Sequence, residues 1–202
     1  RAHVDRAVVA TDSRAIHDAV LAHGGACVMT RADHATGTDR VGEVAAAHPG
    51  YDAVLNVQGD VPLIAPEAIR AALAPLSIPG VAIGTIMTEI TFPKFRDDPS
   101  FVKAVTTPNG QGQHRALYFT RTMAPSGHGP LYQHIGIYAY RRAALDRFVS
   151  LAPSPLEQRE KLEQLRALEA GMRIDVSIID SAPMDVNTPE DLERARAAYQ
   201  TL

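Results

Sequence analysis

Short runs of predominantly apolar residues alternate with segments of helical periodicity in the N-terminal part of the chain. The runs lie at 7–11, 26–30, 53–57 and 81–87. Strands that are apolar along both faces are typical of a parallel sheet covered by helices on both sides. The segments between them, at 14–23, 38–48 and 66–73, have the apolar spacing of such helices. The sequence therefore predicts an α/β fold with a mostly parallel sheet.

The pattern changes between residues 91 and 140. Pro and Gly recur there, and three longer runs with polar interruptions, at 101–107, 114–119 and 133–140, are typical of antiparallel strands. Beyond this region the pattern predicts a helix at 156–170 ended by Gly171, a strand at 174–179 and a final helix at 188–199. We therefore expect a single α/β domain over residues 1–202 with a β-rich subregion at about 91–140.

The composition disfavours several classes of protein. Lys and Arg number 20 against 23 Asp and Glu, so no global positive field attracts nucleic acid. No apolar run reaches the roughly 20 residues that span a bilayer, so no membrane association is expected. The lone Cys27 and the absence of a signal-peptide pattern favour a cytoplasmic protein. No Gly-x-Gly-x-x-Gly follows a predicted strand, which disfavours a dehydrogenase.

A carboxylate follows the third predicted strand, in the segment Asn56-Val57-Gln58-Gly59-Asp60. In an open α/β sheet the ligand crevice lies at the carboxyl ends of the strands, where this loop is expected. Mg²⁺ commonly takes one or two carboxylates plus substrate phosphates, so Asp60 is a candidate magnesium ligand. A turn or a helix cap at Gly59-Asp60 is an equally good explanation.

The loop after the second predicted strand contains Arg31, Gly37 and Arg40. Guanidinium groups in this loop would bind a base edge or a phosphate at the same end of the sheet. The alternative is a solvated loop in which Thr36 or Thr38 caps the following helix.

Polar residues also interrupt two later elements. His134 and Tyr138 fall on one face of a predicted strand that has isoleucines on the other, which indicates either the wall of a site or a hydrogen-bonded core histidine. Glu163 and Gln164 lie on the predicted helix at 156–170. An ion pair between Arg159 and Glu163, one turn apart on the surface, explains that glutamate without any site.

Several strings, taken in order along the chain, resemble one family. They are Thr30 to His34 with Gly37-Thr38, Asn56 to Asp60, Ala116 to Phe119 with Arg121, His134 to Tyr138, Pro153 to Glu157, and Lys161 to Arg166. Together they resemble the 3-deoxy-manno-octulosonate (Kdo) cytidylyltransferases, or CMP-Kdo synthetases, over essentially the whole chain. The Ser-Pro-Leu-Glu and Leu-Glu-Gln-Leu-Arg strings are the most specific, because the related enzymes for sialic acids share the fold without them.

The resemblance implies a Rossmann-like nucleotidyltransferase fold and a homodimer formed through the β-rich subregion. It implies transfer of CMP from CTP to Kdo with release of pyrophosphate, with Mg²⁺ as cofactor, for lipopolysaccharide synthesis. It also assigns residues: Arg31, Gly37, Gln58 and Arg40 to CTP, Asp60 to catalysis and the metal, Asn187 to the metal, and His134, Tyr138, Glu163 and Gln164 to the sugar.

Two departures from the family pattern bear on the site. The family begins with a strand and an arginine- and lysine-bearing loop that holds the triphosphate, so the domain as given lacks that segment, which we expect upstream of Arg1. Near the C-terminus the family has Val-Asp-Thr-Pro, where this chain has Val186-Asn187-Thr188-Pro189. Asn187 is expected either as a neutral, weaker metal ligand or as the N-cap of the final helix, with Asp185 on the opposite face.

The expected reaction is an in-line displacement in which the anomeric hydroxyl of the sugar attacks the α-phosphorus of CTP and pyrophosphate leaves. Positioning and charge neutralisation would supply most of the rate, and metal activation is favoured over His134 as general base. Two alternatives stay open: a cytidylyltransferase for a sialic acid or amino-Kdo, and a catalytically inactive nucleotide-binding homologue.

Overall fold

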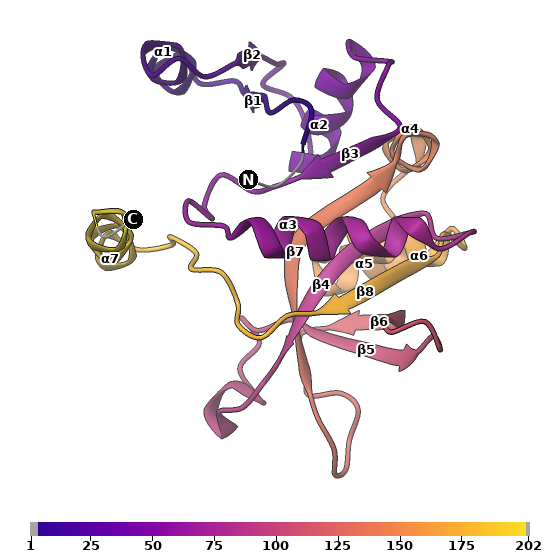
Figure 1. Cartoon of the computed structure of the whole chain (residues 1–202). Coiled ribbons are helices and arrows are strands. Elements are labelled where there is room, and N and C mark those ends of the chain that lie inside the picture. The colour runs from indigo at the N-terminus through magenta and orange to yellow at the C-terminus, as the bar shows by residue number, and fades with distance from the viewer. Residues whose placement is uncertain (1–3, 201–202) are drawn as a thin grey trace.

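The structure, a computed structural model, describes residues 4–200 (Figure 1). The helices are α1 (Arg14–Ala22), α2 (Gly37–Ala46), α3 (Pro66–Leu73), α4 (Arg142–Ser150), α5 (Pro155–Glu160), α6 (Gln164–Glu169) and α7 (Pro189–Tyr199), with short 3₁₀ turns η1 (Ala74–Ser77) and η2 (Pro93–Phe95). The strands are β1 (Val9–Thr11), β2 (Cys27–Met29), β3 (Ala53–Asn56), β4 (Ile83–Glu89), β5 (Lys103–Pro108), β6 (His114–Thr120), β7 (Tyr132–Arg141) and β8 (Ile174–Ile178). Most expected elements are confirmed, with ends shifted by one or two residues.

The strands form a mixed arrangement, which corrects the expectation of a mostly parallel sheet. β1 and β2 pair in parallel, and the other six strands follow the order β3-β7-β4-β8-β6-β5. In that sheet β4 and β8 are parallel, whereas β7 runs antiparallel to both β3 and β4. The mostly parallel arrangement is not found because β7, which comes from the β-rich region, inserts between β3 and β4 and runs antiparallel to both. The α/β class itself is confirmed.

Helices cover both faces of the six-stranded sheet, as its apolar strands predict (Figure 1). On one face α3 packs on β4, β7 and β8, through a cluster that includes Ala68, Ala72, Ile86, Ile135 and Ile137. On the other face a larger cluster joins α4 and α6 to the strands and includes Phe119, Tyr140, Phe148 and Leu165. Gly84 sets the spacing of α3, because a Cβ there would lie 2.2 Å from the carbonyl oxygen of Ala72.

The single helix expected at 156–170 is two helices, and α4 was not among the expected elements. α5 ends at Glu160, and the C-cap residue Lys161 has a left-handed backbone at φ 58°. The guanidinium of Arg121 donates to the carbonyl oxygens of Glu160 at 3.0 Å and Lys161 at 3.4 Å. Side-chain periodicity does not reveal this break, because Leu162 and Leu165, which carry the apolar spacing of the expected helix, both follow it and are both buried.

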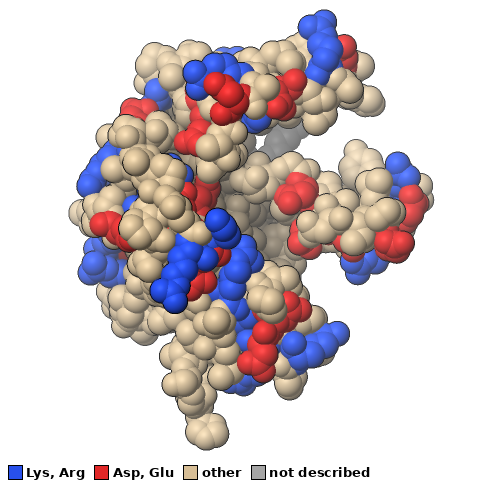
Figure 2. Space-filling model, turned by 180° about the vertical axis from the view of Figure 1, so that it is seen from behind, with Lys and Arg blue, Asp and Glu red and all other residues tan. Residues whose placement is uncertain are grey.

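α7 and the β1–α1–β2 segment project from the same side of the molecule (Figure 1). Figure 2 shows, from behind, that the surface is hollowed between these two projections. The loop from β3 to α3 lies between them, at the carboxyl end of β3. Within residues 4–200, no helix combines the length and the apolar character that crossing a membrane requires.

Candidate functional site

A series of hydrogen-bonded polar side chains, buried at its centre, connects β3, α2 and the start of α6. Gln58 Nε2 donates to Asn56 Oδ1 at 3.2 Å, and Asn56 Nδ2 donates to Thr38 Oγ1 at 3.1 Å. Thr38 Oγ1 in turn donates to Glu163 Oε1 at 2.5 Å. Asn56 is 2% exposed and Thr38 is fully buried. Because buried polar groups cost free energy unless they are paired, this chain constrains the positions of all of its members.

The first turn of α2 places Gly37 against Gln58, at one end of this series of hydrogen bonds. Thr36 caps the helix, accepting from the backbone N–H of Asp39 while the Asp39 carboxylate accepts from the backbone of Thr36. The capping role expected for Thr36 or Thr38 therefore belongs to Thr36. A Cβ at Gly37 would lie 3.4 Å from Gln58 Oε1, so the two residues expected to bind the nucleotide are in contact.

Glu163 and Gln164 face inward at the other end of this series of hydrogen bonds. The surface ion pair between Arg159 and Glu163 is contradicted, because Glu163 bonds Thr38 and its carboxylate is removed from solvent. Burial raises the pKa of Glu163 above its usual value, against the lowering effect of its hydrogen bonds to Thr38 and Thr36. Gln164 is 4% exposed, and its Nε2 has no hydrogen-bond partner among the described residues. An unpaired buried donor of this kind is suited to an acceptor on a ligand.

His134 and Tyr138 share one face of β7, as predicted, and both are buried. The His134 ring lies 5.3 Å from that of Tyr138, and its Nε2 is 3.0 Å from Thr85 Oγ1. Burial lowers the pKa of His134 to about 3, so the imidazole is neutral near pH 7. Burial also raises the pKa of Tyr138, which keeps its hydroxyl protonated. Between them Gly136 is exposed, and a Cβ there would meet nothing within 4 Å.

The loop that carries Asp60 lies beside the segment before α7. Val186 N–H donates to the carbonyl oxygen of Asp60 at 2.8 Å. Asn187 Nδ2 donates to Asp185 Oδ2 at 2.7 Å, so these side chains share one face and the expectation of opposite faces is wrong. Residues two apart in an extended segment point the same way, which is the physical reason.

Asn187 is also not the N-cap of α7. That role belongs to Thr188, whose side chain accepts from the backbone N–H of Asp191. The side chain of Asn187 is therefore not engaged in capping. No group of three or more His, Cys, Asp or Glu side chains that could hold a metal ion occurs among residues 4–200, so any ion here would depend on few protein carboxylates.

The two arginines of the loop after β2 have different surroundings. Arg31 is exposed and pairs with Asp33 at 3.4 Å and Glu43 at 3.7 Å. Arg40 is partly buried, pairs with Asp12 at 3.2 Å and donates to Thr30 Oγ1 at 2.5 Å and to the carbonyl of Arg31 at 3.1 Å. Arg40 thus ties the ends of β1 and β2 together, whereas Arg31 has a solvent-facing guanidinium that can meet a ligand.

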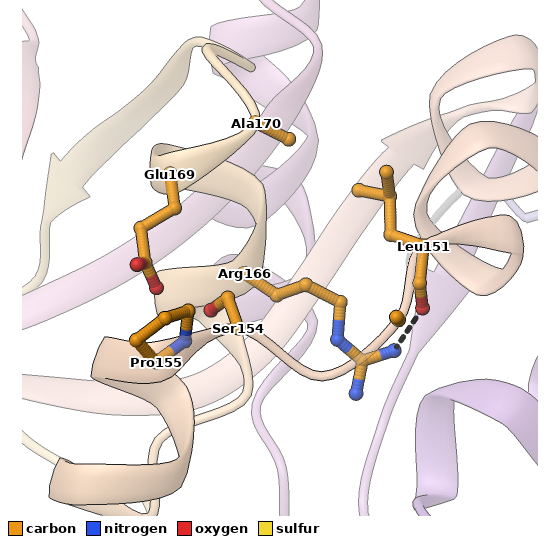
Figure 3. A pocket seen from close by; sticks show the side chains of 7 residues that line it. Leu151, Ser154, Pro155, Arg166, Glu169 and Ala170 are labelled. Carbon is orange, nitrogen blue, oxygen red and sulfur yellow. Dashed lines mark hydrogen bonds between the residues drawn. The ribbon is translucent and has the colours of Figure 1, made fainter.

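A pocket of about 340 Å³ lies elsewhere, beside α5 and α6 (Figure 3). It is lined by Leu151, Ala152, Ser154, Pro155, Arg166, Glu169 and Ala170. Arg166 in this pocket is bound to both oxygens of Glu157, with Nε at 2.8 Å, and to the carbonyl of Leu151 at 3.4 Å. None of the residues expected to bind substrate lines it, so we do not assign it to the site.

Sequence reasoning missed two central members of the site, Thr38 and Asn56, and two supporting ones, Thr85 and Tyr140. Thr38 also hydrogen-bonds Tyr140, and Thr85 bonds the carbonyl of Ile137 at 2.8 Å. The available signal was the position of Asn56, a polar residue that ends an apolar strand. Polar residues at positions expected to be buried are paired or functional, and Asn56 is paired.

The sequence has extensive similarity to cytidylyltransferases. The sequence model of the cytidylyltransferase family matches residues 1–174. A 3-deoxy-manno-octulosonate cytidylyltransferase from Azorhizobium caulinodans is 60% identical over 97% of this chain and 80% of its own length. The same enzyme from Rhodopseudomonas palustris is 58% identical over 98% of this chain and 82% of its own length.

The chain is also similar in structure to solved nucleotidyltransferases. CMP:2-keto-3-deoxy-manno-octonic acid synthetase complexed with CTP superposes with a TM-score of 0.90 at 37% identity, covering 100% of this chain and 83% of that one. 4-Diphosphocytidyl-2C-methyl-D-erythritol synthase superposes with a TM-score of 0.60 at 12% identity, over 97% of this chain and 81% of that one, which is a likeness of fold alone.

Proposed function

The chain belongs to the cytidylyltransferase family, and on that premise we propose how its residues bind CTP, Kdo and a divalent cation. It is a nucleotidyltransferase that transfers CMP from CTP to Kdo, with release of pyrophosphate. The observation that carries this function is the 60% identity to a Kdo cytidylyltransferase over 97% of the chain. We place the reaction in the cytoplasm and its product in lipopolysaccharide synthesis, in line with the family resemblance.

Kdo would bind where the buried polar residues of β7 and α6 meet. Gln164 Nε2 supplies an unpaired donor for a sugar oxygen or for the sugar's carboxylate. Glu163 and Tyr138 supply an acceptor and a hydroxyl, and the open space over Gly136 lies on the same strand as His134 and Tyr138. A polar ligand here would pair the Gln164 amide donor that the protein by itself leaves unpaired, which supports the assignment.

CTP would bind at the loop after β2 and the first turn of α2. Arg31 presents an exposed guanidinium in that loop, and Gly37 at the start of α2 is in contact with Gln58. Arg40 is bound to Asp12 and Thr30, so we give it the role of holding the loop rather than of a free phosphate ligand.

The side chains near Asp60 fit a hard divalent cation such as Mg²⁺. Asp60, Asp185 and Asn187 offer oxygen donors, and the bond from Val186 to the Asp60 carbonyl holds the two segments side by side. Mg²⁺ prefers oxygen ligands and needs few of them from protein when substrate phosphates supply the rest. When bound, it would neutralise charge on the phosphates and acidify the attacking hydroxyl.

In the proposed reaction the anomeric oxygen of Kdo forms a bond to the α-phosphorus of CTP, the bond from that phosphorus to pyrophosphate breaks, and the hydroxyl proton is lost. The residues of this chain orient the two substrates in line. A pKa of about 3 makes His134 a weak base, so its place in the site is to bind and to orient.

A homodimer is part of the proposal and would use the β-rich region. Three large apolar side chains are exposed there: Phe92 at 63%, Leu117 at 54% and Met123 at 41%. Large apolar side chains exposed on a surface are typical of contact surfaces between subunits. Their position within 91–140 matches the dimerisation region that the resemblance implies.

Pyrophosphate release from CTP tests the function against its alternatives. The full-length protein is supplied with CTP, Mg²⁺ and one of three acids: Kdo, a sialic acid, or an amino-Kdo. The proposal predicts release with the highest kcat/KM for Kdo. A higher value with another acid would reassign the substrate. CTP binding by calorimetry without release for any acid would support an inactive homologue.

A further inference from the structure

The hydrogen bonds from Gln58 to Glu163 all run in one direction. Each member donates toward Glu163: Gln58 to Asn56, Asn56 to Thr38, and Thr38 to Glu163. The last of these hydrogen bonds joins two residues that are 125 positions apart in the sequence: Thr38 on α2 and Glu163, the residue before α6. Hydrogen bonds arranged in series polarise one another, so a change at one end alters the strength of the next bond.

The carboxylate of Glu163 fixes this direction. An ionised carboxylate only accepts hydrogen bonds, so Thr38 must point its single hydroxyl hydrogen at Glu163. The Thr38 oxygen can then only accept, which requires the amide nitrogen of Asn56 to face it. The amide oxygen of Asn56 is left to face Gln58, which therefore donates its nitrogen, and the Gln58 amide lies against Gly37.

We propose that Thr38 and Asn56 are positioning residues that couple the binding of the nucleotide at Gln58 and Gly37 to the binding of the sugar acid at Glu163. The inference rests on the proposed function, because it takes the two ends of the chain as parts of the two substrate sites. A sugar that draws on the Glu163 carboxylate changes the bond from Thr38, and through Asn56 the presentation of the Gln58 amide. Each substrate then binds more tightly once the other has fixed the orientation of these hydrogen bonds.

The test measures this coupling in the full-length protein by calorimetry. The Kd of Kdo is determined with and without saturating α,β-methylene-CTP, which cannot be cleaved at the reacting bond. We expect the nucleotide analogue to tighten Kdo binding by about 5-fold or more in the wild type, the lower end of typical coupling. Thr38→Val removes the hydroxyl at nearly constant volume and should bring this factor to about 1. Thr38→Ser keeps the hydroxyl and should preserve the coupling.

Two results would overturn the inference: no coupling in the wild type, or undiminished coupling in Thr38→Val. If the wild type binds neither Kdo nor the nucleotide analogue, the proposed function itself fails and the coupling fails with it. Wild-type binding of both ligands without coupling refutes the coupling alone.

A second measurement needs no substitution, and it applies should Thr38→Val fail to fold. The side-chain amide groups of Asn56 and Gln58 are observed by ¹H–¹⁵N NMR of the wild type while Kdo is added without nucleotide. Both signals should shift together with the same apparent Kd, because the ligand acts on them through Thr38. Unshifted amide signals at saturating Kdo would contradict the inference.

Discussion

Glu163 keeps a carboxylate where burial raises its pKa, so the ionised form is held at a cost to stability. Above pH 4.5 the folded state therefore binds more protons than the unfolded state. The contribution of Glu163 to the free energy of unfolding then falls as the pH rises from 4.5 through the raised pKa of the folded state. A residue kept at such a cost is a candidate for a binding role.

Glu163→Gln should separate the cost of this carboxylate to stability from its role in binding the sugar. The substitution removes the ionisation, so its free energy of unfolding relative to wild type should increase between pH 5 and pH 8. It should also lower kcat/KM for Kdo by roughly 10- to 100-fold, the loss of a hydrogen bond to a charged group. Urea unfolding at both pH values and steady-state kinetics check this. Glu193→Gln, on the exposed face of α7, is the matched control and should change neither.

His134 makes the opposite contribution to the pH dependence of stability. Its folded pKa of about 3 lies below the usual histidine pKa of 6.5, so the unfolded state binds more protons between these values. Stability should therefore fall as pH is lowered through this range, by up to about 1.4 kcal/mol per pH unit. His134→Gln should flatten the profile of unfolding free energy against pH from 6.5 to 4, whereas His128→Gln, at an exposed site, should not. An unchanged slope in His134→Gln would exclude this residue as its source.

Asn187 stands where its side chain contacts Asp185 and lies on the segment bound to the Asp60 loop. Asn187→Asp adds a carboxylate to the proposed cation site, and since charge count tunes affinity it should tighten Mn²⁺ or Mg²⁺ binding by roughly 10-fold. Asp60→Asn should weaken binding and leave the fold intact. Calorimetric titration with the metal alone measures both, with the exposed Asp146→Asn as control. Equal metal affinities in all of these variants would remove the cation from this position.

At the scale of elements, the break between α5 and α6 turns Glu163 and Gln164 inward. Arg166 on α6 binds both oxygens of Glu157 on α5, and both residues are buried. Removing one partner of a buried ion pair leaves the other charge uncompensated. Arg166→Ala should therefore lower the free energy of unfolding by about 3–5 kcal/mol, as measured in urea.

The double substitution Glu157→Met with Arg166→Met is the comparison for that variant. It removes both charges, so it should lose less stability than Arg166→Ala alone. A double variant less stable than the single one would show that the pair contributes more than mutual compensation. The specific strings at 153–157 and 161–166 are explained in part by this pair, since each string supplies one of its members.

The elements themselves could largely be predicted from local patterns, and their connections could not. Ser13 and Thr36 cap α1 and α2, and Gly24 follows α1 with a φ of 75°, all of which short-range sequence signals specify. The break at Lys161 and the insertion of β7 between β3 and β4 depend on contacts between residues far apart in sequence. The roles of Asn56 and Thr38 could not be predicted for the same reason, because these roles come from pairing across the fold.

At the scale of the whole molecule, the proposed dimer is tested through Leu117. Leu117→Glu places a charge on an exposed apolar position of β6 and should shift the mass of the full-length protein in solution toward a monomer. Light scattering after size-exclusion chromatography measures this. Leu192→Glu, at an exposed position of α7, is the control and should leave the mass unchanged. A wild type that is monomeric at micromolar concentration would contradict the dimer.

The proposed function depends on a sugar acid reaching the polar groups at the junction of β7 and α6. A crystal structure of the full-length protein with CMP-Kdo measures this directly. We predict that Gln164 Nε2 lies about 2.7–3.2 Å from an oxygen of the Kdo moiety, with Glu163 in contact with the same sugar. A sugar bound elsewhere, with Gln164 Nε2 still buried and unpaired, would contradict it.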